Sequence, residues 1–454
     1  MKIVINGGGG VGEALADILS HEQHDITVIE QAPSRANALE ETLDCRVMTG
    51  TGSSPSDLRD AGVGGCNIFL AVTNRDEVNL LSCLIAEKMG CPRSIARVRD
   101  RDFHAADLDL PVGELGIDQI INPDEEAAGE IVRLLRNPGT TQVIPLAGGA
   151  VIAAGIAVPP DSRLDGTTLA QLHSEHSNLR YRVVVINRDG EPAIPAGNDH
   201  IESGDELFIV AQPQTVKRLA AMIGQKPSHD QFNRVMILGA SDLGRYLAEM
   251  LEGQCAVTLV DPHGRSAEDA SAQLPGTLVI EGTGHDMDLL ERVGLPEMDA
   301  LVAVSDEEEM NLISCLYAKR LGVPRTIARI ERPFYLPLMM TVDVDAAVSA
   351  RQATVNAILK YVRLGDIKAV ARMRGVGAEG LELVPGPGAK VLDTPLRNLR
   401  FPRGALVGVV VRPHEVVVPD GDTVIRKEDH VVVFALHQAV RKVEKLFARR
   451  KPKA

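Results

Sequence analysis

The chain has 454 residues, about three times the usual length of one domain. Hydrophobic residues make up 44% and charged residues 24%, which is typical of a soluble globular protein and excludes the fibrous and disordered classes. The net charge of -14 and the low aromatic content of 3% argue against DNA, RNA and bare membrane surfaces as partners, so we expect no nucleic acid to bind.

The first part of the chain alternates short apolar runs with longer amphipathic stretches. This alternation predicts a parallel sheet wound with helices on both faces. The run Ile68–Val72 is apolar throughout, as a strand covered on both faces requires. The predicted strands are Lys2–Asn6, Ile26–Glu30, Arg46–Met48, Ile68–Val72, Ile95–Val98 and Gln119–Asn122.

After about residue 136 the pattern changes to short strands and glycine turns, which predicts a small α+β lobe. The uncharged stretch Ile144–Pro160 contains three glycines and three prolines. It therefore fits two short strands and a turn better than a membrane-spanning helix. Further strands are predicted at Arg182–Ile186, Ala193–Ile194 and Glu206–Val210, followed by a helix at Gln212–Met222.

The second half of the chain repeats the first. Gly7–Gly12 returns as Gly239–Gly244, a shift of 239 − 7 = 232 residues. At the same shift, the 32 positions of Asn67–Val98 match Asp299–Ile330 with 15 identities, whereas ordinary composition gives about two by chance. The shift then becomes 227 and later 224, as expected where loops differ in length.

This duplication sets the predicted fold class and domains. We expect a tandem α/β protein in which each half is a Rossmann-like doubly wound parallel sheet followed by a small α+β C-terminal lobe. A polar segment that contains proline separates the copies and is the predicted linker. The expected boundaries are 1–136 for the first Rossmann-like domain, 137–225 for its lobe, 226–232 for the linker, 233–365 for the second Rossmann-like domain and 366–450 for its lobe.

The first glycine loop has the pattern of a dinucleotide-binding site. Its Gly-x-Gly-x-x-Gly spacing follows a strand and opens a helix, whose N-terminus offers unpaired N–H groups to a pyrophosphate. Glu30 ends the second strand, 18 residues after Gly12, where a carboxylate can accept both hydroxyl groups of an adenosine ribose. The alternative is a structural glycine turn with a solvated glutamate. The predicted site residues are Gly7, Gly8, Gly9, Gly10, Val11, Gly12 and Glu30.

The second copy keeps only part of this pattern. Ser241 replaces the middle glycine and Asp242 follows it. A Cβ at that position crowds a pyrophosphate, and the aspartate adds negative charge. The second site could therefore bind weakly, bind another nucleotide or bind none. Its candidate residues are Gly239, Ala240, Ser241, Asp242, Leu243, Gly244 and Asp261.

Small polar residues repeat at the predicted ligand edge of both sheets. Thr73 and Asn74 follow the fourth strand of the first copy, and Ser305 and Asp306 follow that of the second. The carboxyl ends of the strands form the edge at which such sheets bind ligands, so these residues could contact ribose or phosphate. The alternative, which is compatible with binding, is that they act as helix N-caps.

Two further pairs are candidates for nucleotide contacts. Arg97 and Arg329 lie at equivalent places in the fifth strands, where an arginine can bind phosphate or form a structural ion pair. Thr51 and Thr283 could meet the adenine edge, or they could belong to plain turns.

No catalytic or metal-binding residues are predicted. The six cysteines show no metal-ligand spacing, and Cys83 and Cys315 fall on apolar helix faces, so we expect reduced, mostly buried thiols as in the cytosol. No histidine, lysine or tyrosine repeats as a candidate proton donor. The N-terminal residues lack the pattern of a signal peptide, and we expect neither export nor a transmembrane helix.

Taken together, the motifs resemble the RCK family of regulatory units, which join a KTN-type Rossmann domain to a C-terminal lobe. The resemblance covers nearly all of the chain, with two units in tandem. It rests on the glycine loop with Glu30, on Gly50-x-x-Ser53, on Thr73-x-x-Asp76-Glu77-x-Asn79 and on Ile95–Val98.

The resemblance implies regulation rather than catalysis. RCK units form homo-oligomers, as dimers or tetramer rings, beneath an integral-membrane pore protein, and change shape with NAD(H) or ATP/ADP. Two units in one chain imply a cytoplasmic, peripheral subunit of a Trk-type potassium uptake channel or transporter. The alternatives are an RCK regulator of an efflux-type potassium transporter, or an NAD-dependent oxidoreductase, for which we can name no proton-transfer residue.

Overall fold

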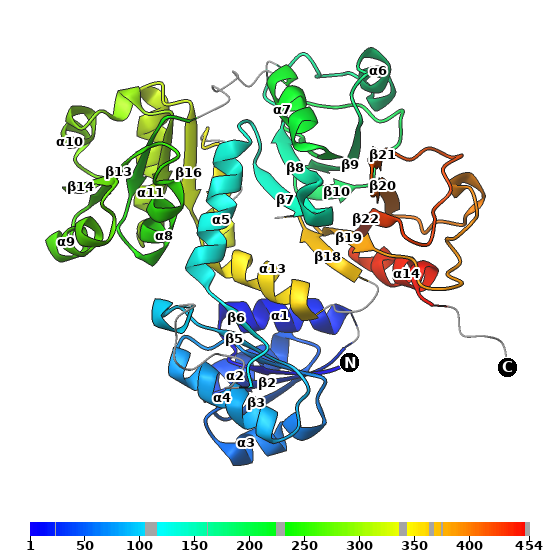
Figure 1. Ribbon diagram of the computed structural model, residues 1–454, viewed down its shortest axis with the longest axis horizontal. Helices are drawn as coiled ribbons and strands as arrows, with labels where there is room; N and C mark the ends of the chain where they lie inside the picture. The colour runs from blue at the N-terminus through cyan, green and yellow to red at the C-terminus, as the bar shows by residue number, and fades with distance from the viewer. Residues whose placement is uncertain are drawn as a thin grey trace. The chain divides into compact units, whose positions relative to one another are not determined.

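The described part of the chain folds into two parallel and two antiparallel sheets (Figure 1). This computed structural model describes residues 1–22, 24–104, 116–160, 162–223, 232–335, 343–362, 367–373 and 376–449. The expected tandem α/β duplication is confirmed, because each six-stranded parallel sheet is followed in sequence by a five-stranded antiparallel one. Of the predicted linker 226–232, residues 226–231 lie outside the described residues.

The first parallel sheet has the strand order β3-β2-β1-β4-β5-β6. Its order reverses between β1 and β4, so the carboxyl ends of these two strands flank a point where open α/β sheets bind ligands. All six predicted strands are present, each within one residue of its expected ends: β1 Lys2–Asn6, β2 Asp25–Glu30, β3 Arg46–Thr49, β4 Ile68–Ala71, β5 Ser94–Arg97 and β6 Gln119–Ile121. The intervening helices are α1 Gly10–His21, α2 Pro33–Thr42, α3 Pro55–Asp60 and α4 Asp76–Lys88.

The second parallel sheet repeats this order as β14-β13-β12-β15-β16-β17. Its central strand β15 is buried along its whole length, as β4 is in the first sheet, which explains why both runs lack polar residues. The strands are β12 Arg234–Leu238, β13 Ala256–Asp261, β14 Thr277–Glu281, β15 Ala300–Ala303, β16 Arg325–Arg329 and β17 Ala346–Val348. The helices are α8 Asp242–Leu251, α9 Gly264–Gln273, α10 Met287–Arg292 and α11 Glu308–Arg320.

The two lobes are antiparallel sheets of the same topology, ordered β10-β9-β11-β8-β7 and β21-β20-β22-β19-β18. Side chains of both sheets, including Phe208 and Phe434, share one hydrophobic core. The first lobe contains β7 Gln142–Leu146, β8 Val151–Ala157, α6 Leu169–Glu175, β9 Tyr181–Arg188, β10 Glu191–Ala193, β11 Glu206–Ala211 and α7 Pro213–Met222. The second contains β18 Ile367–Arg372, β19 Ala378–Leu383, β20 Ala405–Arg412, β21 Glu415–Val417, β22 His430–Leu436 and α14 His437–Phe447.

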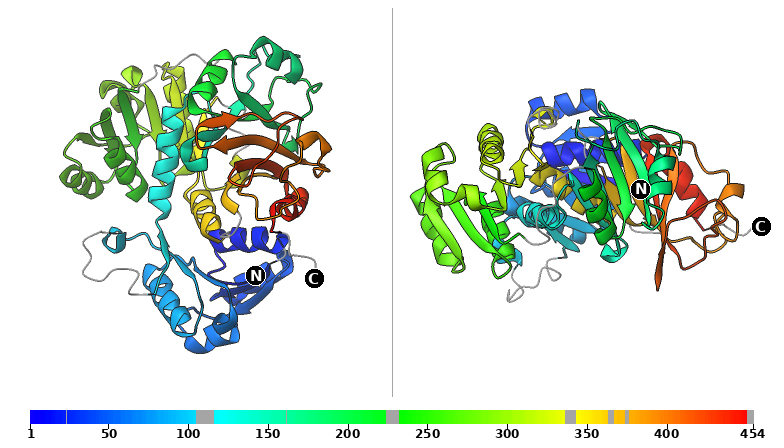
Figure 2. Two further views of the ribbon diagram at one scale, coloured as in Figure 1. Left: turned by 45° about the vertical axis from the view of Figure 1, so that its right-hand side comes forward. Right: turned by 90° about the horizontal axis from the view of Figure 1, so that it is seen from above.

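The helix that follows the second parallel sheet, α13 (Ala350–Val362), packs on the first. Met1–Ala127 and Ser349–Val362 form one compact unit, in which α13 lies beside α1 (Figures 1 and 2). Ile358 is fully buried in the core that contains Ile3 and Leu15. Arg93 Nη1 also donates a hydrogen bond to the carbonyl oxygen of Tyr361 at 3.3 Å. The first sheet thus takes a covering helix from the other copy.

An equivalent arginine makes a similar hydrogen bond in the other compact unit. That unit contains Ala128–Val348 and the described residues after 363. Arg325, which matches Arg93, donates from Nη2 to the carbonyl oxygen of Thr140 at 2.6 Å. Thr140 follows α5 (Pro123–Arg136), the helix that comes after the first parallel sheet in sequence. The end of α5 is also held by a hydrogen bond of 2.7 Å from Arg136 Nη2 to Gln254 Oε1. Each copy therefore binds the backbone near the end of the helix that follows the parallel sheet of the other copy.

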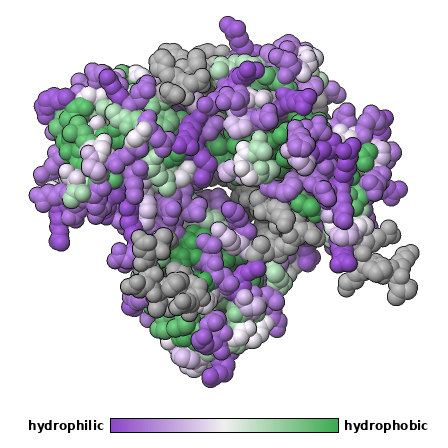
Figure 3. All heavy atoms as spheres, viewed as in Figure 1, coloured by the Kyte–Doolittle hydropathy of each residue, from purple (hydrophilic) through white to green (hydrophobic). Residues whose placement is uncertain are grey.

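The face of the molecule drawn in Figure 3 is mainly polar. Polar and charged side chains cover most of this face, and apolar side chains reach it in separate small patches. Within the described part of the chain, no helix has both the length and the apolar composition needed to cross a bilayer.

Shortening a buried side chain of α13 should destabilise the packing of this helix on the first sheet. Ile358→Ala removes a fully buried side chain from the core between α13 and α1, which should destabilise that unit by about 2–5 kcal/mol. Hydrogen exchange should show faster exchange in β1 and α1 but not in β12. Lys360→Ala, at an exposed position of the same helix, is the control and should leave both unchanged. Equal exchange in the Ile358→Ala variant and the wild type would contradict this packing.

Candidate functional site

Two glycines fix the start of α1 against the end of β1. Gly7 has φ +110°, and a Cβ there would lie 2.9 Å from the backbone nitrogen of Thr73. A Cβ at Gly12 would lie 1.8 Å from the carbonyl oxygen of Gly7, a distance that no side chain tolerates. Gly239 and Gly244 are in the same situation, with φ +109° and a distance of 1.9 Å. Both copies therefore need these glycines for packing, as the motif predicts.

The middle of the loop differs between the copies. Gly9 caps α1, and a Cβ added to it would have no protein atom within 4 Å. Ser241 has nearly the same backbone angles, so its side chain occupies the corresponding space and its hydroxyl donates to the carbonyl oxygen of Val304 at 3.4 Å. Packing does not require a glycine at residue 9, whereas the close approach of a pyrophosphate to the backbone does.

The remaining loop residues begin the helices. Gly10 is the first residue of α1, and Asp242 is the first of α8, where it forms an ion pair with Arg245 at 2.6 Å. Val11 is half-buried and Leu243 is fully buried, so both pack inward. What these positions offer a ligand is therefore the backbone N–H groups of the helix start.

An acid lies beside each loop. Glu30 Oε2 accepts the N–H of Gly8 at 2.8 Å, and Asp261 Oδ2 accepts that of Ala240 at 2.6 Å. The other oxygen of each carboxylate accepts the N–H of the residue two positions later, at 2.9 Å in both copies. Since a carboxylate has about four acceptor sites, each acid keeps capacity for the hydroxyl groups of a ribose.

Buried asparagines hold the ends of the fourth and fifth strands together. Asn79 Oδ1 accepts the N–H of Thr73 at 3.0 Å, and its Nδ2 donates to the carbonyl oxygen of Arg97 at 2.7 Å. Asn311 makes the same two bonds to Ser305 and to the residue that matches Arg97, at 3.1 and 3.2 Å. The motifs predict no role for these asparagines, although both recur at equivalent positions on an apolar helix face.

The N-cap interpretation of these strand ends is wrong. Helix α4 begins at Asp76 and is preceded by Arg75, while α11 is preceded by Glu307, and neither preceding residue caps its helix with a side chain. Thr73 and Ser305 lie two residues before the cap positions. Their hydroxyl groups donate instead to the Oδ1 atoms of the buried asparagines at 2.7 Å.

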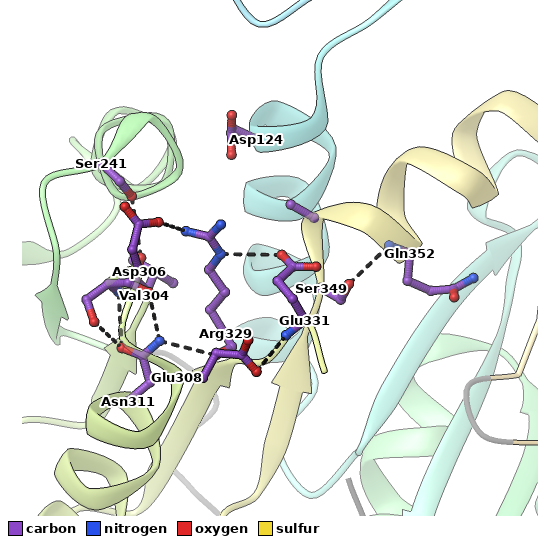
Figure 4. A network of polar contacts seen from close by, with 12 residues as sticks. Asp124, Ser241, Val304, Asp306, Glu308, Asn311, Arg329, Glu331, Ser349 and Gln352 are labelled. Atoms are coloured by element: carbon purple, nitrogen blue, oxygen red, sulfur yellow. Dashed lines mark hydrogen bonds and ion pairs between the residues drawn. The ribbon is translucent and has the colours of Figure 1, made fainter. Parts of the chain in front are cut away.

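The strand arginines have different partners in the two copies. Arg97 is 8% exposed, and its Nη1 donates to the carbonyl oxygen of Thr73 at 2.8 Å. Arg329 lies between two carboxylates, with Nη1 2.8 Å from Asp306 and Nε 3.4 Å from Glu331 (Figure 4). Asn74 stands in the first copy where Asp306 stands in the second. The structural ion pair that was the alternative to phosphate binding is therefore present at Arg329.

The two threonines lie in hydrogen-bonded turns. The Thr51 N–H donates to Asp57 Oδ2 at 2.8 Å, and this bond lowers the pKa of the Asp57 carboxyl group. Thr283 Oγ1 accepts the N–H of His285 at 3.2 Å. The turn that contains Thr51 passes close to the end of β1, because a Cβ at Gly52 would lie 2.0 Å from an amide atom of Asn6. Adenine contact by either threonine stays a prediction.

The cysteines are mostly buried, and the Sγ atoms of Cys66 and Cys91 lie 3.1 Å apart. Cys83 and Cys315 are fully buried as predicted, and burial raises the pKa of both thiols. Over the ranges that the structure describes, no group of three or more histidine, cysteine or acidic side chains could hold a metal ion.

The sequence matches known families along most of its length. The TrkA-N domain family matches residues 3–123 and 235–350, and the TrkA-C domain family matches residues 153–224 and 381–448. The chain is 34% identical to Trk system potassium uptake protein TrkA homolog 2 of Methanosarcina mazei, over 98% of this chain and 100% of that protein. It is 33% identical to Trk system potassium uptake protein TrkA of Vibrio alginolyticus, over 98% of each. The chain therefore belongs to the TrkA family.

Solved structures show the same fold at low sequence identity. The GsuK channel bound to NAD has a TM-score of 0.59 and 15% identity, over 99% of this chain and 79% of that one. The GsuK RCK domain has a TM-score of 0.57 and 15% identity, over 99% and 95%. These likenesses confirm the tandem RCK-type fold that the sequence motifs implied.

The second and third glycines of the motif, Gly9 and Gly12, should respond differently to substitution. Gly12→Ala forces a Cβ against the Gly7 carbonyl oxygen and should destabilise the first unit by about 1–3 kcal/mol. Gly9→Ser copies the backbone and residue type of Ser241 and should change stability by at most about 0.5 kcal/mol. Urea unfolding monitored by hydrogen exchange in α1 measures both. Equal destabilisation by the two variants would refute the packing role assigned to Gly12.

Proposed function

We propose that this member of the TrkA family is a cytoplasmic regulatory subunit that binds NAD(H) at its first glycine loop and thereby controls a Trk-type potassium channel or transporter. The geometry of that loop carries the proposal. Gly9 leaves the N-terminus of α1 open to a ligand, and the Glu30 carboxylate lies beside the loop. A pyrophosphate suits the helix N–H groups, and the adenosine ribose suits the carboxylate.

Two arguments support NAD(H) as the ligand. The GsuK channel bound to NAD shares the fold. In addition, a carboxylate at the position of Glu30 repels a 2′-phosphate, which favours NAD(H) over NADP(H). The loop and Glu30 suit the ADP portion of ATP or ADP as well, so these two nucleotides are the competing ligands.

In the second copy we propose weak binding or none. The Ser241 side chain fills the space that Gly9 leaves open, and Asp242 adds a carboxylate at the helix start. Arg329 is already held by Asp306 and Glu331. The first loop is therefore the principal site.

Regulation also requires an assembly whose states bind the nucleotide with different affinities. Leu81 of α4 is 44% exposed and Ile313 of α11, its equivalent, is 49% exposed. Apolar side chains exposed at matching positions of both copies support a homo-oligomer, a dimer or a tetramer ring, that buries them. Such an assembly would act beneath the membrane-embedded potassium channel or transporter.

Binding of NADH should depend on Gly9. Gly9→Ser puts a side chain where the pyrophosphate approaches the backbone, so calorimetric titration should show affinity reduced roughly 10- to 100-fold, the loss expected for one or two charge-assisted hydrogen bonds. Ser241→Gly in the second loop is the matched control and should leave the high-affinity phase unchanged. Parallel titrations with ATP and ADP rank the nucleotides. If Gly9→Ser binds all three as the wild type does, the site assignment is wrong.

Self-association should depend on the repeated apolar residues. The double variant Leu81→Asp with Ile313→Asp places charges at both exposed positions and should give a smaller species in size exclusion with light scattering. Leu278→Asp is the control, since Leu278 is 59% exposed but matches Arg46 in the other copy. Unchanged mass for the double variant would exclude these helices as the assembly surface.

A further inference from the structure

A basic residue of the second copy lies over the first glycine loop. Arg351 is in the first turn of α13, the helix that packs on the first sheet. A Cβ added to Gly10 would lie 2.8 Å from Arg351 Cδ and 3.3 Å from Arg351 Nη1. The guanidinium group is therefore in contact with the start of α1, where the N–H groups available to a pyrophosphate lie.

This contact accounts for a glycine that the motif does not require. The Gly-x-Gly-x-x-Gly pattern needs glycine at residues 7, 9 and 12, but Gly10 is not among them. A Cβ at residue 10 would require the Arg351 side chain to move, so the glycine lets this arginine lie against the start of α1. In the second copy the equivalent residue is Asp242, which pairs with Arg245 of its own helix.

The charges at this contact favour an anion. The N-terminus of α1 carries a partial positive charge, and the guanidinium group of Arg351 places a second positive charge beside it. A phosphate group at this point would be attracted by both, and arginine binds phosphate through two parallel hydrogen bonds. At the shift of 351 − 227 = 124, the residue that matches Arg351 in the first copy is Asp124. The charge at this helix position is therefore opposite in the two copies.

We propose that Arg351 is a phosphate-binding residue of the first nucleotide site, so that the second copy completes the site of the first. The inference rests on the function proposed above and specifies the ligand class: a nucleotide with at least two linked phosphates, such as NADH or ADP. A ligand that joins α1 to Arg351 also stabilises the packing of α13 on the first sheet. Occupation of the first loop is thereby linked to the polypeptide of the second copy.

Variants of the full chain test this role. Arg351→Ala should weaken the binding of NADH and of ADP roughly 10- to 100-fold, as loss of a charged hydrogen-bond donor does, and should flatten the dependence of affinity on salt. Arg351→Lys should restore the salt dependence and part of the affinity. Lys360→Ala, a charge deletion at an exposed position of the same helix, should change neither.

Hydrogen exchange supplies the second readout. NADH should slow exchange in residues 350–362 of the wild type and much less so in Arg351→Ala. Wild-type affinity and salt dependence in Arg351→Ala would overturn the inference while leaving the proposed function intact. Weaker binding with an unchanged salt dependence and no rescue by lysine would also overturn it, since that result assigns Arg351 a structural role. If the wild type binds neither nucleotide, the proposed function falls as well.

Discussion

The contact between the third glycine of the loop and the first is the constraint on which the site depends. Because a Cβ at Gly12 would lie 1.8 Å from the Gly7 carbonyl oxygen, the helix can approach the strand end only with glycine there. That approach directs the N-terminus of α1 to the point where the strand order reverses, and it brings the Gly8 N–H to Glu30. Gly244 and Gly239 repeat the contact, so it belongs to the scaffold rather than to ligand choice.

The two copies place different chemistry on this common scaffold. The first has Gly9 at the middle of the loop, Asn74 at the strand end and an arginine from α13 at the helix start. In the second copy, Ser241 replaces Gly9 and Asp306 replaces Asn74. Asp306 forms an ion pair with Arg329. On the proposed function, duplication allows one copy to specialise in binding an anionic ligand, while the other keeps the fold and supplies a helix.

Local patterns in the sequence predict the strands, the glycine turns and the acid that ends β2, since periodicity and turn chemistry determine these features. The asparagines Asn79 and Asn311 were missed because a polar residue on an apolar helix face has no local signature of its partner. Arg351 was missed for a stronger reason: it meets Gly10 only because α13 crosses to the first sheet, and no pattern near residue 351 encodes that contact.

The central proposal is that the first glycine loop is the nucleotide site and that the second copy contributes to it. A crystal structure of the chain with NADH tests this directly. We expect one dinucleotide per chain, its pyrophosphate between the N-terminus of α1 and the guanidinium group of Arg351, and its ribose on Glu30. A dinucleotide bound at Gly239–Gly244 instead, or one bound at the first loop without contact to Arg351, would contradict the account.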